Sequence, residues 1–107
     1  MTRESLTALL VQRLFGWKVR RNRFMTGDER EWIKRERFQP TSSLDAAYRL
    51  LGAAKPIDYK LGGSGSGPCW ARVMLNGASG EASSDSLPLA ICLAIAHALG
   101  IEVETID

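Results

Sequence analysis

LPLAICLAIAHALG, residues 87–100, is the longest apolar stretch of this 107-residue chain. Pro88 suits the first turn of a helix, where a missing backbone N–H is tolerated, and Gly100 suits the position just beyond the helix end. The apolar residues leave almost no polar face, which is the pattern of a helix covered on most sides. His97 interrupts the stretch, which is shorter than the roughly 18 apolar residues that span a bilayer. We therefore expect a buried helix at the centre of the domain, with no membrane contact.

Two segments that precede this helix have the alternation of half-buried strands. Apolar residues fall at every second position in IDYKL (residues 57–61) and again in WARVML (residues 70–75). The run GGSGSG (residues 62–67) lies between them, and this connection is too short for a parallel crossover, so the segments form an antiparallel hairpin. We interpret residues 62–67 as the flexible tip of that hairpin.

The same Gly/Ser run has another interpretation, as a loop that binds phosphate. A P-loop requires Lys followed by Ser or Thr after its last glycine, at the start of a helix. Here Gly67 is followed by Pro68 and Cys69, and a strand comes next. Backbone N–H groups of such a run can still form a nest for an anion. Residues 62–67 could thus serve a nucleotide or anion binder, or an enzyme. We rank this function below the others considered.

The first third of the chain has the same order of a helix followed by a hairpin. Thr2 can cap a helix whose leucines recur on one face and which ends at Gly16. WKVR (residues 17–20) and EWIKRERF (residues 31–38) are rich in strand formers. NRFMTGDER (residues 22–30) supplies the turn between them. We expect a second β-hairpin here, with its apolar side chains directed to the core.

A further helix separates the two hairpins. Ser42 stands three residues before Asp45, the spacing of a capping box that opens a helix. The helix ends at Gly52 or Pro56, since neither residue favours its continuation.

The resulting order of elements is α-β-β-α-β-β-α, in a single domain that covers residues 1–107. We predict the α+β class, with an antiparallel sheet of two β-hairpins packed with three helices in a helix/sheet/helix sandwich. IEVET (residues 101–105) is a candidate for a short C-terminal strand. A chain of this length buries enough surface for one core without metals or disulfides.

Charge is distributed unevenly along the chain. Residues 1–38 hold ten Lys or Arg against five acidic residues, and residues 39–107 hold four against seven. Basic side chains of the first hairpin are candidates for contact with a nucleic acid or a partner. The acidic residues among them weaken the field that a phosphate backbone would feel, which favours a solvated strand. The candidate contact residues are Lys18, Arg20, Arg21, Arg23, Arg35 and Arg37.

No constellation of catalytic or metal-binding residues stands out in the sequence. His97 is the only histidine, and its neighbours one turn away, Leu93 and Ile101, cannot bind a metal. Cys69 has no base near it in the sequence, so a structural thiol is favoured over a nucleophile. No nucleophile elbow and no dinucleotide fingerprint is present. We expect a protein that is not an enzyme and that binds no cofactor and no metal.

The cysteines and the N-terminal stretch bear on the cellular compartment of the protein. MTRESLTALL (residues 1–10) carries an acidic residue early and has no small-residue cleavage site, so it is not expected to be a signal peptide. Cys69 and Cys92 are then expected to stay reduced, in the cytoplasm of a bacterial host.

Two sets of sequence segments have counterparts in a known family. The first consists of GWKV (residues 16–19), a strand with Trp and FQPTSSLDAAYRLL (residues 38–51), and the second is SGEASSDSLPLAICLAIAHALG (residues 79–100). Together they resemble the phage ABA sandwich domain of small phage and prophage proteins. The matching positions are caps, turns and core positions, and no catalytic residue is among them: Gly16, Pro40, Gly80, Pro88 and Cys92.

This resemblance implies an antiparallel sheet packed between helices, and an origin in a mobile element. The chain departs from the family at residues 22–30, where a shorter turn is expected, and at residues 62–67, where a compact turn is usual. The activity of the family is largely unassigned, so the resemblance implies no reaction.

The sequence as a whole favours a small phage- or prophage-type protein that acts as a non-catalytic protein-binding module. Its partner would be a host or phage protein. The alternative is a nucleic-acid-binding accessory protein that uses the basic hairpin around residues 18–37, with weak and non-specific binding.

Overall fold

The computed structural model describes residues 1–63, 67–103 and 106. Within these residues lie three α-helices, six strands and one short 3-10 helix. The helices are α1 (Arg3–Phe15), α2 (Leu44–Ala54) and α3 (Leu87–Ala98), and the 3-10 helix is η1 (Arg35–Arg37). The strands are β1 (Lys18–Val19), β2 (Arg23–Met25), β3 (Trp32–Lys34), β4 (Asp58–Gly63), β5 (Cys69–Leu75) and β6 (Ala78–Ser84).

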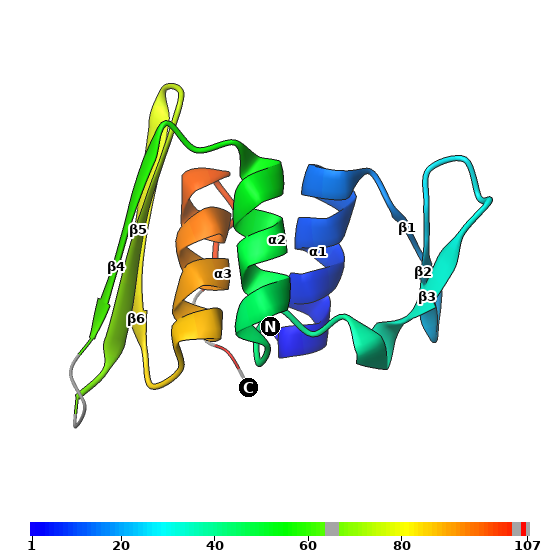
Figure 1. The fold of residues 1–107 in the computed structure, drawn as a ribbon, viewed down its shortest axis with the longest axis horizontal. Coiled ribbons are helices and arrows are strands. Elements are labelled where there is room, and N and C mark those ends of the chain that lie inside the picture. Colours follow the sequence, from blue (N-terminus) through cyan, green and yellow to red (C-terminus); the bar gives the residue numbers. More distant parts are fainter. Residues whose placement is uncertain (64–66, 104–105, 107) are drawn as a thin grey trace.

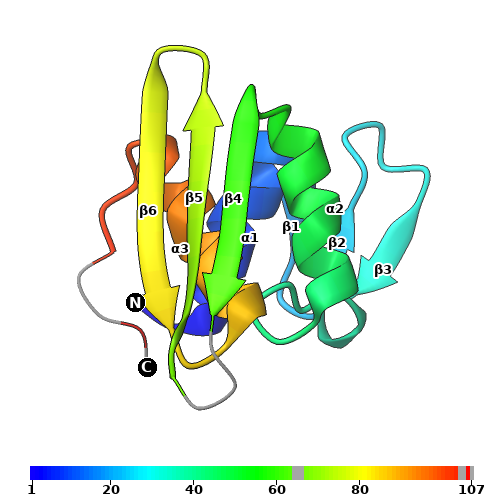
Figure 2. The same cartoon turned by 60° about the vertical axis from the view of Figure 1, so that its left-hand side comes forward.

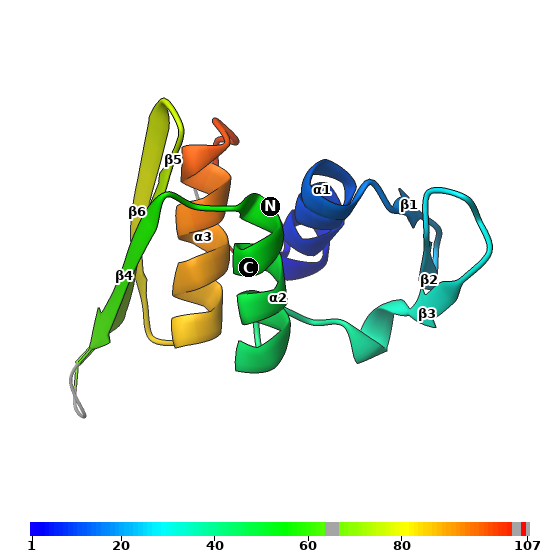
Figure 3. The ribbon, with the colours of Figure 1, turned by 45° about the horizontal axis from the view of Figure 1, so that its top comes forward.

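The elements form two antiparallel sheets with the helices between them (Figure 1). The C-terminal sheet has the order β4-β5-β6, and α3 packs on β5 and β6. The N-terminal sheet has the order β1-β2-β3 and lies beyond α1, at the opposite end of the molecule in Figures 1 and 3. The predicted α+β class, with three helices and antiparallel pairing, is confirmed.

The order of the layers differs from the prediction. A single sheet covered by helices was expected, but α2 packs against both α1 and α3, so the helices form a middle layer that keeps the two hairpins apart. Alternation in a strand shows that one face is buried, and it does not show whether the other strands of the chain join the same sheet. The arrangement is therefore sheet/helices/sheet.

Each sheet also has one strand more than predicted. β2 lies in the segment expected to be a turn, and it is the central strand of its sheet, where Phe24 pairs with Val19 and with Ile33. β6 pairs with β5 along its whole length, from Cys69 opposite Ser84 to Leu75 opposite Ala78. The sequence of β6, ASGEASS, is made of small and polar residues, which do not show the apolar alternation of a strand.

Local signals fix most helix ends. The Thr2 hydroxyl accepts a hydrogen bond from the amide of Ser5 at 3.0 Å, and Gly16 has φ +71° just past the end of α1. In α2 the capping residue is Ser43, whose hydroxyl accepts from the amide of Ala46 at 3.4 Å. The predicted cap, Ser42, is therefore wrong by one residue, because the helix begins at Leu44.

α3 is the centre of the main core, as predicted. Ile91, Cys92 and Ile95 have no exposed surface, because β5 and β6 cover one side of the helix and α2 covers another. A smaller aromatic cluster fills the space between α1 and the N-terminal sheet. In this cluster the ring centroids of Phe15 and Trp17 are 4.7 Å apart, and those of Trp17 and Phe38 are 5.6 Å apart.

Two other predictions concern the ends of elements. Residues 101–103 are not a strand, and residues 104 and 105 of the proposed C-terminal strand lie outside the described residues. Gly62 and Gly63 belong to β4 and are not part of the hairpin tip, of which residues 64–66 lie outside the described residues. In the part of the chain that is described, no helix is both long and apolar enough to cross a membrane.

Candidate binding surfaces

The basic residues of the first hairpin do not form one surface. Glu29, in the turn after β2, places its carboxylate 3.1 Å from the Lys18 ammonium and 3.4 Å from the Arg20 guanidinium. Both cations are thus paired with one carboxylate on the protein surface. Their charge is partly neutralised, which leaves less of it for a partner.

Arg35 has a different position, at the junction of β3 and η1. Its guanidinium donates hydrogen bonds to the backbone carbonyls of Arg20, at 3.2 Å, and of Glu4, at 3.3 Å. The same group lies 5.2 Å from the centre of the Phe24 ring. Arg35 therefore connects the N-terminal sheet to the first turn of α1 and has a fixed orientation.

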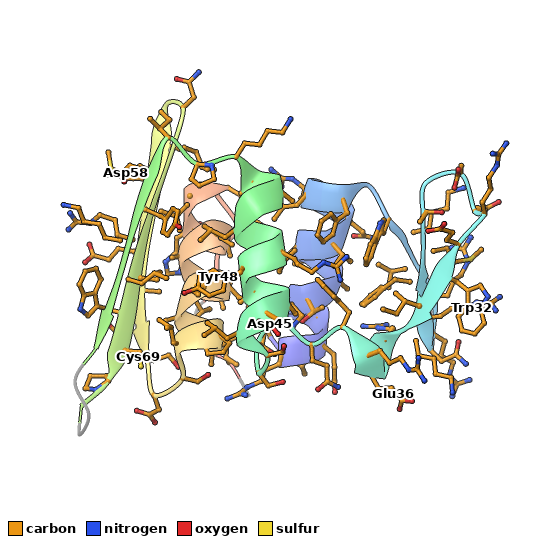
Figure 4. The ribbon with its side chains drawn as sticks, viewed as in Figure 1. Trp32, Glu36, Asp45, Tyr48, Asp58 and Cys69 are labelled. Carbon is orange, nitrogen blue, oxygen red and sulfur yellow. The ribbon has the colours of Figure 1, made fainter. Side chains whose placement is uncertain are left out.

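Arg23 and Trp32 lie on the outer face of the N-terminal sheet. Trp32 is 57% exposed and extends away from the helices (Figure 4), with the Arg23 guanidinium 5.6 Å from its ring centre. Phe24, the other aromatic residue of β2 and β3, is buried. Arg21 and Arg37 are exposed, and neither makes an ion pair with a residue that the structure describes.

An open cavity of about 670 Å³ lies beside this hairpin. Its walls come from the first turns of α1, the turn between β1 and β2, η1 and the segment that leads into α2. Of the six predicted contact residues, only Arg21 and Arg35 line it, and Arg3 and Lys34 are also part of its wall.

A second group of exposed apolar side chains lies on α2 and on or beside the strands of the C-terminal sheet. Eight large apolar side chains are exposed in the described residues, and six of them lie on α2, at β4 or on β5. Figure 2 shows the outer face of the C-terminal sheet, which no helix covers. We call these six residues the β4 surface: Leu44, Tyr48, Ile57, Tyr59, Trp70 and Met74.

The two faces of the C-terminal sheet contribute differently to this surface. Tyr59 pairs with the buried Val73, so it lies on the helix-facing side of the sheet near its free edge. Trp70 lies on the outer side, opposite Gly62, and a β-carbon on Gly62 would come within 2.5 Å of the indole ring. Gly62 thus has a packing role, because it leaves room for the Trp70 side chain to lie across β4.

The remaining side chains that bear on chemistry are His97, Cys69, Cys92 and Asp28. Nδ1 of His97 donates to the backbone carbonyl of Glu81 at 2.9 Å, which connects α3 to β6. Burial raises the pKa of Cys92 to about 12, and Cys69 lies in β5 with a partly exposed side chain. The pKa of Asp28 is lowered, chiefly by the hydrogen bond from the Thr26 hydroxyl. No group of three His, Cys, Asp or Glu suited to a metal occurs among the described residues.

The sequence prediction did not include the β4 surface. Its signal was present, because Tyr59 continues a strand pattern while Trp70 and Met74 occupy the positions expected to face solvent. Exposed apolar side chains on two paired strands are informative when one of the strands lies at the edge of a sheet, and the edge position of β4 was known only from the structure.

Comparison with solved structures identifies a similar fold. No family model matches the chain, and no match is found among curated proteins. A crystal structure of a phage protein from Bacillus cereus ATCC 14579 superimposes with a TM-score of 0.77 at 16% sequence identity, covering 97% of this chain and 93% of that chain. This chain has the fold of a phage protein. The finer assignment to the phage ABA sandwich family stays a prediction.

Proposed function

We propose that this chain is a small, non-catalytic binding protein of phage or prophage type. It binds an extended segment of a host or phage protein at the free edge of β4, in the bacterial cytoplasm. The observation that carries this proposal is the β4 surface, in which Ile57 and Tyr59 are exposed at one edge strand and Trp70 and Met74 are exposed on the strand paired with it. The fold that the chain shares with a phage protein supports the phage-type origin.

The edge of β4 is suited to strand addition. Among the described residues β4 pairs with β5 alone, so backbone groups on its other side have no strand partner there, and the Tyr59 amide donates instead to the Asp58 carboxylate at 2.9 Å. An extended peptide can bind such an edge as an additional strand, with affinity from backbone hydrogen bonds and specificity from alternate side chains. Tyr59 on one side of the sheet and Trp70 on the other would give such a peptide apolar contacts on both its faces.

The opposite edge of the same sheet lacks these features. α3 packs along β6, and β6 carries only small or polar side chains. Ile57 and Tyr59, by contrast, are 68% and 48% exposed. Tyr48 extends from α2 in front of α3 (Figure 4), on the side where β4 lies in Figure 1. The sheet therefore has one edge with apolar side chains beside it, and we assign the partner to that edge.

Affinity capture with the full chain from a lysate of the bacterial host tests this proposal. A captured protein, purified and titrated, should bind the wild-type chain and protect the amides of β4 from hydrogen exchange. Ile57→Lys with Tyr59→Lys should abolish binding, because the two lysines place charge where apolar contact is expected.

Ala78→Lys is the matched control, since it adds a lysine to an exposed position of the opposite edge strand that pairs with no residue of the β4 surface. A partner that still binds the double variant, or that is lost with Ala78→Lys, would contradict the assignment to β4. If light scattering shows a dimer of the wild-type chain and a monomer of the double variant, the occupant of the β4 edge is a second copy of this chain.

Nucleic-acid contact is a second candidate function, and the exposure of Trp32 favours it. The indole lies beside Arg23 on the outer face of the N-terminal sheet, where a base could stack and phosphates could approach Arg23. One exposed aromatic side chain and a hairpin whose cations are partly paired make a small platform. We therefore rank this function below protein binding.

A further inference from the structure

We propose a second, separate ligand site in the cavity beside the first hairpin, and we assign its ligand class as small molecules that carry a phosphomonoester. The site lies between α1, the N-terminal sheet and the segment that precedes α2, at the opposite end of the molecule from the strand β4 (Figure 1). It differs from the nucleic-acid candidate, which involves the outer face of that sheet.

The charges that line the cavity carry the argument. Four cations and two carboxylates are in its wall, which gives a net charge of 4 − 2 = +2. In the described part of the chain, no ion pair engages any of the six groups, whereas Lys18 and Arg20 share Glu29. A phosphomonoester is close to a dianion at neutral pH and matches this net charge. The six groups are Arg3, Arg21, Lys34, Arg35, Glu4 and Glu36.

Arg35 gives the site a fixed donor. Its two hydrogen bonds to backbone carbonyls and its position over Phe24 hold the guanidinium in place without neutralising its charge. A guanidinium has five N–H donors, so donors remain for a ligand. Pre-organised guanidinium groups suit the geometry of phosphate oxygens, and little side-chain entropy is lost on binding.

Two buried hydroxyl groups also line the cavity. Thr7 and Thr41 are 5% and 4% exposed, and neither side chain makes a hydrogen bond with another described residue. In the same part of the chain, no buried side-chain oxygen is both unpartnered and closed off from solvent. Both hydroxyl groups therefore reach the cavity, where they can donate to an anion in place of water.

Helix orientation and size narrow the ligand class. The first turn of α1 and the segment that enters α2 both border the cavity, so the positive ends of two helix dipoles favour an anion there. The volume of about 670 Å³ is in the range of sites for organic ligands and exceeds the needs of a bare phosphate ion. The site therefore suits a phosphate ester with an organic group attached.

Isothermal titration calorimetry of the full chain tests this assignment with adenosine 5′-monophosphate, inorganic phosphate and adenosine as probes. The monophosphate should bind, phosphate should bind more weakly and adenosine should not bind. Arg21→Gln and Lys34→Gln should each weaken binding about tenfold, because each removes one charge-assisted hydrogen bond. Thr41→Val, which removes a hydroxyl and keeps the shape, should weaken it as well.

Arg37→Gln is the matched control, because Arg37 is an exposed arginine of η1 outside the cavity wall. If it weakened binding as much as Arg21→Gln, the attraction would be diffuse and the site would be refuted. Equal binding of adenosine and its monophosphate, or no binding of either phosphate probe at millimolar concentration, would also overturn the proposal. Ile57→Lys with Tyr59→Lys should leave monophosphate binding unchanged, which separates this site from the β4 surface.

Discussion

Gly80 of β6 lies directly against the carbonyl oxygen of Ala94 in α3. A β-carbon on Gly80 would overlap that oxygen and the amide nitrogen of Ala98. The strand and the helix therefore approach each other backbone to backbone, which only a residue without a side chain permits. This contact explains why the side of β6 that faces α3 has small residues and how α3 can cover it closely.

Gly80→Ala should lower the free energy of unfolding by about 1–3 kcal/mol, because the added methyl forces α3 and β6 apart. Urea unfolding followed by circular dichroism measures the change. Gly52→Ala is a suitable control, since a β-carbon there has no atom within 4 Å and a helix favours Ala over Gly by about 0.5–1 kcal/mol. Equal effects of the two substitutions would mean that the close contact does not exist in solution.

Ile95→Ala should lower the free energy of unfolding by about 2–5 kcal/mol, since Ile95 is fully buried on α3, a helix that packs against both the sheet and α2. Ile57→Ala removes the same groups from an exposed position and should change the same quantity by less than about 0.5 kcal/mol. Ile95→Asp should prevent cooperative folding. A well-folded Ile95→Asp protein would show that this face of α3 is accessible to water.

Elements in which apolar residues recur at a regular spacing were predictable from the sequence. α3 is apolar on nearly all sides, and β4 and β5 alternate with period two, so their type and their antiparallel pairing followed. β6 was missed because its face toward α3 is formed by Gly80 and Ala82, whose small side chains carry no apolar signal. β2 was missed because Phe24 stands in a segment otherwise rich in turn residues.

The candidate sites were less predictable, because they depend on contacts between distant segments. The sequence shows ten basic residues in the first third of the chain, but not that Glu29 reaches both Lys18 and Arg20. It also does not show that Arg3 and Thr41 line one cavity. These contacts are set by how α1, the N-terminal sheet and the start of α2 pack together.

The two thiols should differ in reactivity in the folded protein. Cys69 is partly exposed and should react with a thiol reagent such as 5,5′-dithiobis(2-nitrobenzoic acid) at pH 8. Cys92 has no exposed surface and an elevated pKa, so it should react only after unfolding. Mass spectrometry of the labelled protein distinguishes the sites, and rapid labelling of Cys92 would contradict the packing of α3.

Stability at alkaline pH should depend on Cys92. Burial disfavours the thiolate and raises the pKa of Cys92 in the folded protein to about 12, above its ordinary value of 9.0. As the pH rises above 9, the unfolded chain therefore loses this proton first, and the free energy of unfolding falls by up to about 1.4 kcal/mol per pH unit. Cys92→Ala lacks this contribution, so its stability should approach that of the wild type between pH 9 and 12. Parallel curves for the two proteins would contradict the burial.

The outer face of the N-terminal sheet allows a sharp test of nucleic-acid contact. Fluorescence anisotropy with single- and double-stranded oligonucleotides should show weak, non-specific binding that is lost near physiological salt, where the screening length is about 8 Å. The triple variant with Arg20, Arg21 and Arg23 changed to Ala should remove this binding. Trp32→Ala should weaken binding of the single-stranded oligonucleotide only, because stacking requires unpaired bases. Sub-micromolar binding that survives physiological salt and is lost in the triple variant would place nucleic-acid binding above protein binding, since diffuse surface charge alone does not resist screening at that ionic strength.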